Sequence, residues 1–166
     1  GVVSATVDDR QPTVNSLLPA PLARRVHPVG RLDKATTGLL LLTDDGAWSH
    51  RITAPRYHCA KVYRATLAEA LVADAAERLA AGLMLRGEAK PVRPARLQRL
   101  SATEVRIEVT EGRYHLVRRL FAALGNRVLT LHRERVGGVS LDPKLRPGQW
   151  RRLTDEERRW FFSSAD

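Results

Sequence analysis

Four stretches of the chain alternate apolar and polar residues with the two-residue period of a β-strand, and this pattern limits the possible folds more than any other feature. They are residues 60–67, 95–100, 104–110 and 128–135. Because successive side chains of a strand point to opposite faces, the alternation predicts a sheet with one covered face. Only three residues separate the second stretch from the third, which predicts a hairpin.

Helix signals stand between and after these stretches. Thr154 with Glu157 has the spacing of a capping box, and so has Asp74 with Glu77. Apolar residues recur at helical spacing over residues 116–124. Strands interspersed with three or four helices predict an α+β domain built on a mixed sheet.

An apolar run, residues 38–43, contains four consecutive leucines and precedes Asp44 and Asp45. We expect it to form one strand that is buried on both faces. The run is far shorter than the ~18 residues that a membrane helix needs, so we expect no membrane association. The single cysteine, Cys59, permits neither an internal disulfide nor a cysteine cluster for zinc. We therefore expect a cytoplasmic protein without metal or cofactor.

The charge is strongly basic. Lys and Arg together number 28 against 18 Asp and Glu, for a net charge of +10. Most of the basic residues are arginines, whose planar guanidinium binds phosphate in a bidentate manner and stacks on bases. The excess is concentrated in residues 61–152. This distribution favours a nucleic-acid partner, although an arginine-rich proteome would give the same composition.

Asp33 lies in a loop between two glycines, just before the leucine run, where a rigid scaffold can present a carboxylate. The alternative is that Asp33 only accepts hydrogen bonds from loop amides. A Mg²⁺ site formed by Asp33, Asp44 and Asp45, as in a nuclease, is a further alternative, but adjacent carboxylates point apart. The histidines include no i, i+4 pair, so no zinc site is predicted.

A second segment, residues 111–121, combines an apolar helical stripe with several cations near the expected helix start. The apolar stripe indicates core packing. The cations suit either a phosphate-binding surface or an ordinary solvated face. They are Arg113, His115, Arg118 and Arg119.

Taken together, these segments resemble the RsuA group of ribosomal pseudouridine synthases, in order and over nearly the whole chain. The Tyr-His pair at residues 114–115 is more similar to the branch that acts on small-subunit rRNA than to the branches acting on large-subunit rRNA. The motifs that carry the resemblance are Gly30-Arg31-Leu32-Asp33, Thr37-Gly38 with the leucines and Thr43-Asp44-Asp45-Gly46, Lys61-Val62-Tyr63, Glu111-Gly112-Arg113-Tyr114-His115 with Arg118-Arg119, and Leu131-His132-Arg133-Glu134-Arg135-Val136-Gly137-Gly138.

The resemblance implies a pseudouridine synthase catalytic domain over residues 1–166, with a mainly antiparallel central sheet flanked by helices. It also implies a truncated first strand at residues 1–4 and the absence of the S4-like RNA-binding domain that usually precedes this domain. The implied partner is 16S rRNA or an assembling small ribosomal subunit. A monomer is the default expectation for the oligomeric state. Alternatives are an RNA-binding module without activity and a synthase that acts on 23S rRNA.

Carried over by position, Asp33 matches the catalytic aspartate, Tyr63 the active-site tyrosine and Arg118 the active-site basic residue. Arg31 matches an arginine that helps to fill the space of the displaced base. A guanidinium next to Asp33 would keep the carboxylate ionised, and we expect Arg118 to supply it. The other residues expected to bind RNA are Lys61, Arg113, His115, Arg119 and Arg133.

Overall fold

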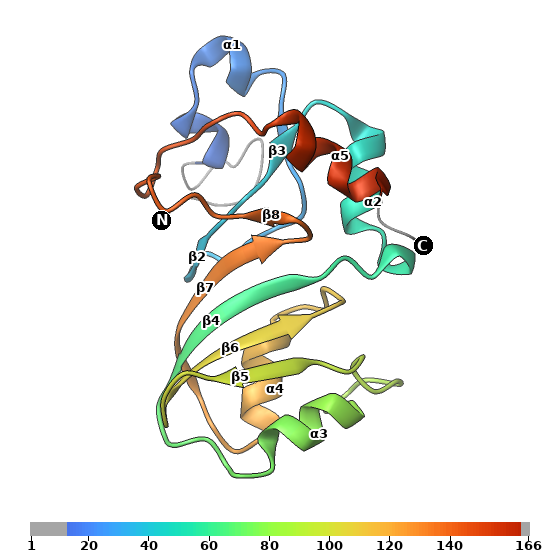
Figure 1. The fold of residues 1–166 in the computed structure, drawn as a ribbon, viewed down its shortest axis with the longest axis vertical. Helices are drawn as coiled ribbons and strands as arrows, with labels where there is room; N and C mark the ends of the chain where they lie inside the picture. The colour runs from blue at the N-terminus through green and yellow to red at the C-terminus, as the bar shows by residue number, and fades with distance from the viewer. Residues whose placement is uncertain (1–12, 164–166) are drawn as a thin grey trace.

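The computed structural model describes residues 13–163 as a curved sheet with helices on one side and a helical cap at one end (Figure 1). The main sheet has the strand order β2-β7-β4-β6-β5, and β8 pairs with β7. Its strands are β2 (Thr36–Gly38), β4 (Lys61–Leu67), β5 (Arg96–Arg99), β6 (Glu104–Val109), β7 (Val128–Val136) and β8 (Val139–Ser140).

Only the β2–β7 pair is parallel within the described part of this sheet, and the other pairs are antiparallel. The expected mixed and mainly antiparallel α+β fold is therefore confirmed. The alternation in the sequence sets the two faces of β4. Ala65 is fully buried on the inner face, whereas Arg64 on the outer face forms an ion pair with Glu104.

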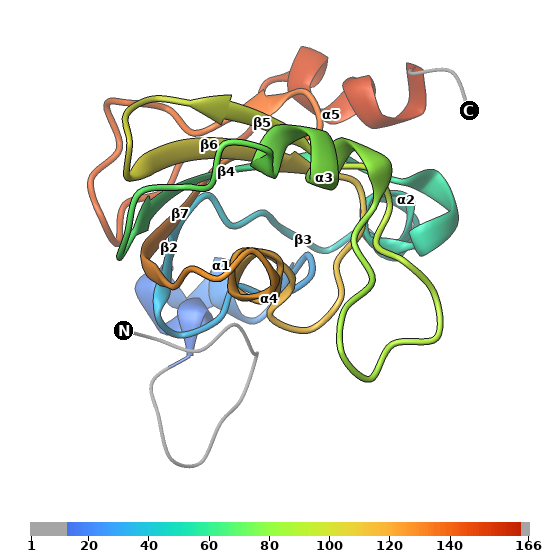
Figure 2. The ribbon, with the colours of Figure 1, turned by 90° about the horizontal axis from the view of Figure 1, so that it is seen from below.

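Helices α3 (Ala75–Ala81) and α4 (Leu116–Ala123) cover the inner face of the sheet. In Figure 1, α4 lies behind β5 and β6, and Figure 2 shows it end-on, on one side of the strands. The apolar stripe of α4 packs with Val105 and Ile107 of β6 in one buried cluster, as its spacing predicts. Asp74 precedes α3 as expected, although its side chain makes no capping hydrogen bond.

A second cluster holds the other end of the molecule. There α2 (Gly46–Thr53) packs beside α5 (Asp155–Ser163) (Figure 1). The rings of Trp48 and Phe161 meet edge to face, with centroids 5.3 Å apart. The predicted capping box at the start of α5 is confirmed. The Glu157 N–H donates to the Thr154 hydroxyl at 3.1 Å, and the Thr154 N–H donates to the Glu157 carboxylate at 2.8 Å.

The smaller elements connect these parts. They are the 3₁₀ helices η1 (Val14–Leu17) and η2 (Pro55–Tyr57), helix α1 (Ala20–Ala23), and the two-stranded sheet of β1 (His27–Pro28) and β3 (Leu42–Thr43). Within residues 13–163 no helix is long and apolar enough to span a membrane. The strand expected at the start of the chain lies outside the described residues.

The leucine run is not one doubly buried strand, and that prediction was wrong. The chain leaves the main sheet after Gly38, crosses through residues 39–41 and joins the small sheet as β3. Of the four leucines only Leu41 is fully buried. The run is apolar because it crosses from one sheet to the other beside the second hydrophobic cluster, against which Leu39 packs.

Candidate active site

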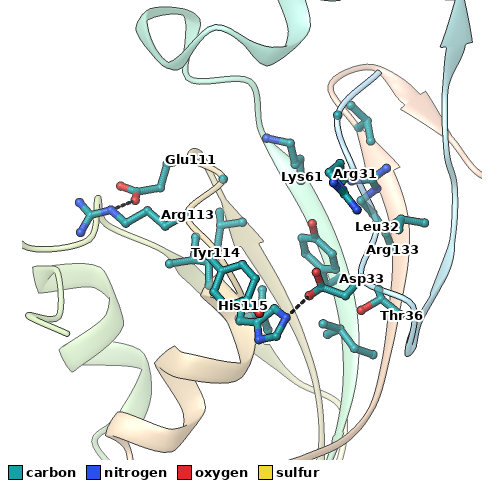
Figure 3. Close-up of a pocket in the computed structure, with 18 of the residues that line it drawn as sticks. Arg31, Leu32, Asp33, Thr36, Lys61, Glu111, Arg113, Tyr114, His115 and Arg133 are labelled. Carbon is teal, nitrogen blue, oxygen red and sulfur yellow. Dashed lines mark ion pairs between the residues drawn. The ribbon is translucent and has the colours of Figure 1, made fainter. Parts of the chain in front are cut away.

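A cavity of about 590 Å³ opens where the two hydrophobic clusters meet (Figure 3). Its volume lies within the ~300–1,000 Å³ of typical small-molecule sites. The wall comes from the loop before β2, from β4 and β7, and from the segment that leads into α4. Five arginine or lysine side chains line it against two carboxylates, so the cavity suits a ligand that carries phosphate. The cations are Arg31, Lys61, Arg113, Arg118 and Arg133, and the carboxylates are Asp33 and Glu111.

Asp33 projects into this cavity from the loop between β1 and β2 (Figure 3). The loop is closed by a turn in which the Thr36 N–H donates to the Asp33 carbonyl at 2.8 Å. The carboxylate is 38% exposed, and its Oδ2 lies 3.5 Å from Nε2 of His115. The Asp33 carboxylate is therefore accessible to a ligand, and its ion pair is with a histidine of the opposite wall.

His115 is held in an unusual backbone conformation. It immediately precedes α4 and has a φ of 50°, in the left-handed region that a residue with a Cβ rarely adopts. Its ring stacks on Tyr114, with centroids 3.8 Å apart and an interplanar angle of 16°. Tyr114 is 76% exposed, so this pair presents an aromatic surface at the rim of the cavity.

Tyr63 and Lys61 stand on the same side of β4, as the alternation predicts, and both line the cavity. Tyr63 is opposite Arg133 of β7 in the strand register and packs against the larger hydrophobic cluster. The structure therefore brings Asp33, Tyr63 and Arg118 to one cavity, although their catalytic roles stay predictions.

Arg133 and Lys61 place positive charge deep in the wall. Arg133 is only 3% exposed, and its Nε donates to the Leu39 carbonyl at 2.9 Å. Burial lowers the pKa of Lys61, and the positive charge of Arg133 lowers it further. Among the ion pairs within residues 13–163, none joins either cation to a carboxylate. An anionic ligand would compensate both charges.

Arg118 does not form the expected ion pair with Asp33. Its Nη1 donates to the Val128 carbonyl at 3.3 Å, and the ion pair of Asp33 is formed by His115 instead. Arg118 belongs to the first turn of α4, which packs against the sheet, whereas His115 precedes the helix and reaches across the cavity. The contact between Asp33 and His115 is an ion pair when the imidazole is protonated.

Arg113 and Arg119 bind the protein itself. Arg113 donates to the carbonyls of Lys90 and Pro91 at 2.9 and 2.8 Å and forms an ion pair with Glu111. Arg119 forms an ion pair with Glu88 at 2.9 Å. These contacts attach the segment that carries Tyr114 and His115 to residues 86–91. The RNA-binding roles of both arginines stay predictions, and their guanidinium groups have partners within the protein.

Comparisons with known proteins agree with this geometry. The family model for RNA pseudouridylate synthase matches residues 1–123. The chain is 52% identical, over 157 residues, to the ribosomal small subunit pseudouridine synthase A of Escherichia coli (strain K12), covering 95% of this chain and 68% of that protein. The protein of the same name from Vibrio cholerae is 50% identical over the same share of both chains. A crystal structure of a pseudouridylate synthase matches with a TM-score of 0.93 at 47% identity, covering 97% of this chain and 69% of that one.

The chain belongs to the RNA pseudouridylate synthase family. The resemblance seen in the sequence motifs is thereby confirmed. A pseudouridylate synthase must receive a nucleotide, and the open cavity with its cationic wall is of the kind that this ligand requires.

The three aspartates of the magnesium hypothesis do not form a common group in this pseudouridylate synthase. Asp45 caps α2 by accepting the N–H groups of Ala47 and Trp48, and Asp44 forms an ion pair with Arg25 at 3.1 Å. In the described part of the chain, no three acidic, histidine or cysteine side chains are grouped closely enough to hold a metal ion.

The sequence did not single out two residues that line the site of this synthase, Thr36 and Tyr114. Thr36 is buried beside Asp33. The sequence could not identify it because a strand of three residues is too short to show by alternation which face each side chain occupies. Tyr114 stands next to His115 in the motif, and its surroundings in the sequence could have identified it as a site residue. An aromatic residue within a cationic loop segment is a common feature of nucleic-acid binding surfaces.

Proposed function

We propose that this protein converts a uridine of small-subunit ribosomal RNA, the 16S rRNA, to pseudouridine, with Asp33 as the catalytic carboxylate. The observation that carries the proposal is the accessible carboxylate of Asp33 in a cavity lined by a surplus of cations. The relatives named ribosomal small subunit pseudouridine synthase A support the choice of RNA.

The reaction rearranges one nucleotide. The N1–C1′ bond breaks, the uracil turns over, and a C5–C1′ bond forms, while a proton leaves C5 and a proton is gained at N1. Nothing is oxidised or hydrolysed, so the reaction balances without a cofactor. Asp33 acts on the ribose, either by attack at C1′ or by removal of the C2′ proton. Uracil leaves as a resonance-stabilised anion, which reduces the need for a second carboxyl as acid.

The surrounding residues serve binding and orientation. Tyr63 offers its ring to the uracil and its hydroxyl for removal of the C5 proton. Lys61 and Arg133 supply positive charge to the phosphate groups of the flipped nucleotide. Arg118 is the active-site basic residue and supplies positive charge to the cavity, and Arg31 fills the space that the displaced base leaves.

The rim of the cavity extends the contact to the neighbouring nucleotides. Tyr114, supported from beneath by His115, offers a face on which a flanking base stacks. Arg113 and Arg119 keep this platform in place and add positive charge near the RNA backbone. The protein acts in the cytoplasm as a monomer on rRNA or on assembling small subunits.

The proposal is tested by mapping pseudouridine in small-subunit rRNA from cells that lack the gene. One pseudouridine is expected to disappear, to return with the wild-type protein and to stay absent with Asp33→Asn. Asp33→Asn preserves the size of the side chain, so loss of the modification with unchanged thermal stability identifies the carboxylate as the catalyst. An unchanged rRNA pattern, or full rescue by Asp33→Asn, contradicts the proposal.

A further inference from the structure

Thr36 carries a buried hydroxyl without a partner. The residue is 8% exposed, and its Oγ1 has no hydrogen-bond partner within residues 13–163. It begins β2 and lines the cavity beside Asp33 (Figure 3). Its own N–H closes the turn on the Asp33 carbonyl, so the hydroxyl and the catalytic carboxylate belong to one compact turn.

An unpaired buried hydroxyl is unfavourable, and folded proteins pair nearly all such groups. The next residue shows the ordinary arrangement, because the Thr37 hydroxyl lies 2.7 Å from Nδ1 of His132 and donates to the Leu131 carbonyl at 3.4 Å. Glu111 is the other cavity residue with such an atom, Oε1, and its carboxylate already forms an ion pair with Arg113. Thr36 therefore has the free hydrogen-bonding capacity in the wall next to Asp33.

We propose that the Thr36 hydroxyl binds the 2′-hydroxyl of the target nucleotide. This inference rests on the proposed function, in which Asp33 acts at C1′ or C2′ of the ribose. The 2′-hydroxyl is attached to C2′, so by either route it lies at or next to the reacting carbon, and it is the group there that can donate a hydrogen bond, since the ring oxygen O4′ can only accept. A threonine hydroxyl both donates and accepts, as does the 2′-hydroxyl, so the pair is complementary. Thr36 is thus a residue that positions the ribose and favours RNA over DNA.

The test compares Thr36→Val with Thr36→Ser and with Thr37→Val as the matched control. Valine keeps the shape of the side chain and removes the hydroxyl. Because the hydroxyl lacks a protein partner, Thr36→Val is expected to unfold at the same temperature as wild type or higher. Thr37→Val removes a hydroxyl that has protein partners, so it is expected to unfold at a lower temperature.

Binding is then measured in the Asp33→Asn background, which prevents turnover. The probe is an rRNA oligonucleotide that spans the mapped target and carries either uridine or 2′-deoxyuridine there. With Thr36 or Thr36→Ser, the uridine oligonucleotide is expected to bind about two- to tenfold more tightly, as one neutral hydrogen bond provides. With Thr36→Val the two oligonucleotides bind equally, while Thr37→Val keeps the preference.

Several results would overturn the inference. In the binding measurement, they are a preference for uridine over 2′-deoxyuridine that survives Thr36→Val, that is lost in Thr36→Ser, or that is already absent from the Asp33→Asn protein. In the stability measurement, the contrary result is a fall in the unfolding temperature of Thr36→Val as large as that of Thr37→Val. Failure of the proposed function is a separate result, since it appears earlier, as an unchanged pseudouridine pattern in the cells that lack the gene.

Discussion

Nε2 of His115 lies 3.5 Å from Oδ2 of Asp33, and this contact joins the two walls of the cavity. Both side chains are 38% exposed, so the contact is open to solvent and to an arriving nucleotide. His115 maintains it from a left-handed backbone conformation of a kind that costs about 1–3 kcal/mol in a residue with a Cβ. Strain that the surrounding structure maintains next to the carboxylate indicates that the position of the ring matters for the reaction.

His115→Asn tests this role. Asparagine tolerates the left-handed conformation, but its shorter side chain does not reach Asp33. We expect the rate of tritium release from C5-labelled uridine in rRNA to fall about tenfold, equivalent to ~1.4 kcal/mol, with little change in RNA affinity. His58 has a similar φ of 48° and is not part of the cavity wall, so His58→Asn is the control. Equal rates for both variants would exclude a role of the ring in orienting Asp33.

Arg118→Ala tests the predicted active-site cation. Arg118 lines the cavity and is fixed by the Val128 carbonyl. We expect single-turnover rates to fall by about a hundredfold or more, because electrostatic groups aimed at a reacting centre contribute on this scale. The affinity for rRNA, measured by filter binding, is expected to change far less. Arg118→Lys, which keeps the charge but not the fork, should recover part of the rate. Similar losses in rate and affinity would reassign Arg118 to RNA binding.

Tyr114→Ala tests the aromatic platform. A stacked base contributes ~1–3 kcal/mol, so we expect the affinity for the target oligonucleotide to fall about five- to a hundredfold. Tyr114→Phe keeps the ring and should bind like wild type. Tyr114 is largely exposed, so neither change is expected to alter the unfolding temperature. If phenylalanine binds as weakly as alanine, the contribution comes from the hydroxyl and not from stacking.

The regular parts of the fold follow from the sequence because their signals are local. Strand alternation identified β4, β6 and β7, and the Thr154–Glu157 spacing identified the start of α5. The prediction of one buried strand for the leucine run was wrong because apolar composition does not indicate where a chain passes from one sheet to another. Likewise, Asp33 was found through its motif, but its pairing with His115 was not, since that contact depends on how α4 docks against the sheet.

Gly38 shows how the backbone fixes the position of Asp33. It ends β2 with a φ of 115°, and a Cβ there would overlap the backbone N and O of Arg133. Gly38→Ala therefore forces β2 away from β7, which displaces both the Asp33 loop and the buried guanidinium of Arg133. We expect a loss of at least ~2 kcal/mol in the free energy of urea unfolding, together with loss of activity. Gly46→Ala is the control, since nothing lies within 4 Å of a Cβ there. Equal stability of the two variants would contradict the close approach of β2 to β7.

Glu157 links the last helix to the preceding loop. Its carboxylate accepts two hydrogen bonds from Arg151, at 2.8 and 2.9 Å, and these lower its pKa from 4.5 to about 2, aided by the capping bond from Thr154. A carboxyl whose pKa is lowered by folding stabilises the protein fully at pH values above its pKa in the unfolded chain. This stabilisation is lost as the pH falls toward and through its pKa in the folded protein.

We expect Glu157→Gln to reduce the free energy of unfolding by about 1–2 kcal/mol at pH 7, because charge-assisted hydrogen bonds are replaced by neutral ones. The difference between wild type and variant, measured by urea unfolding at a series of pH values, should shrink between pH 4.5 and about 2. Glu156→Gln, in the same helical turn, should show no such dependence. A gap between wild type and Glu157→Gln that stays constant down to pH 2 would show that the carboxylate contributes through packing and not through its charge.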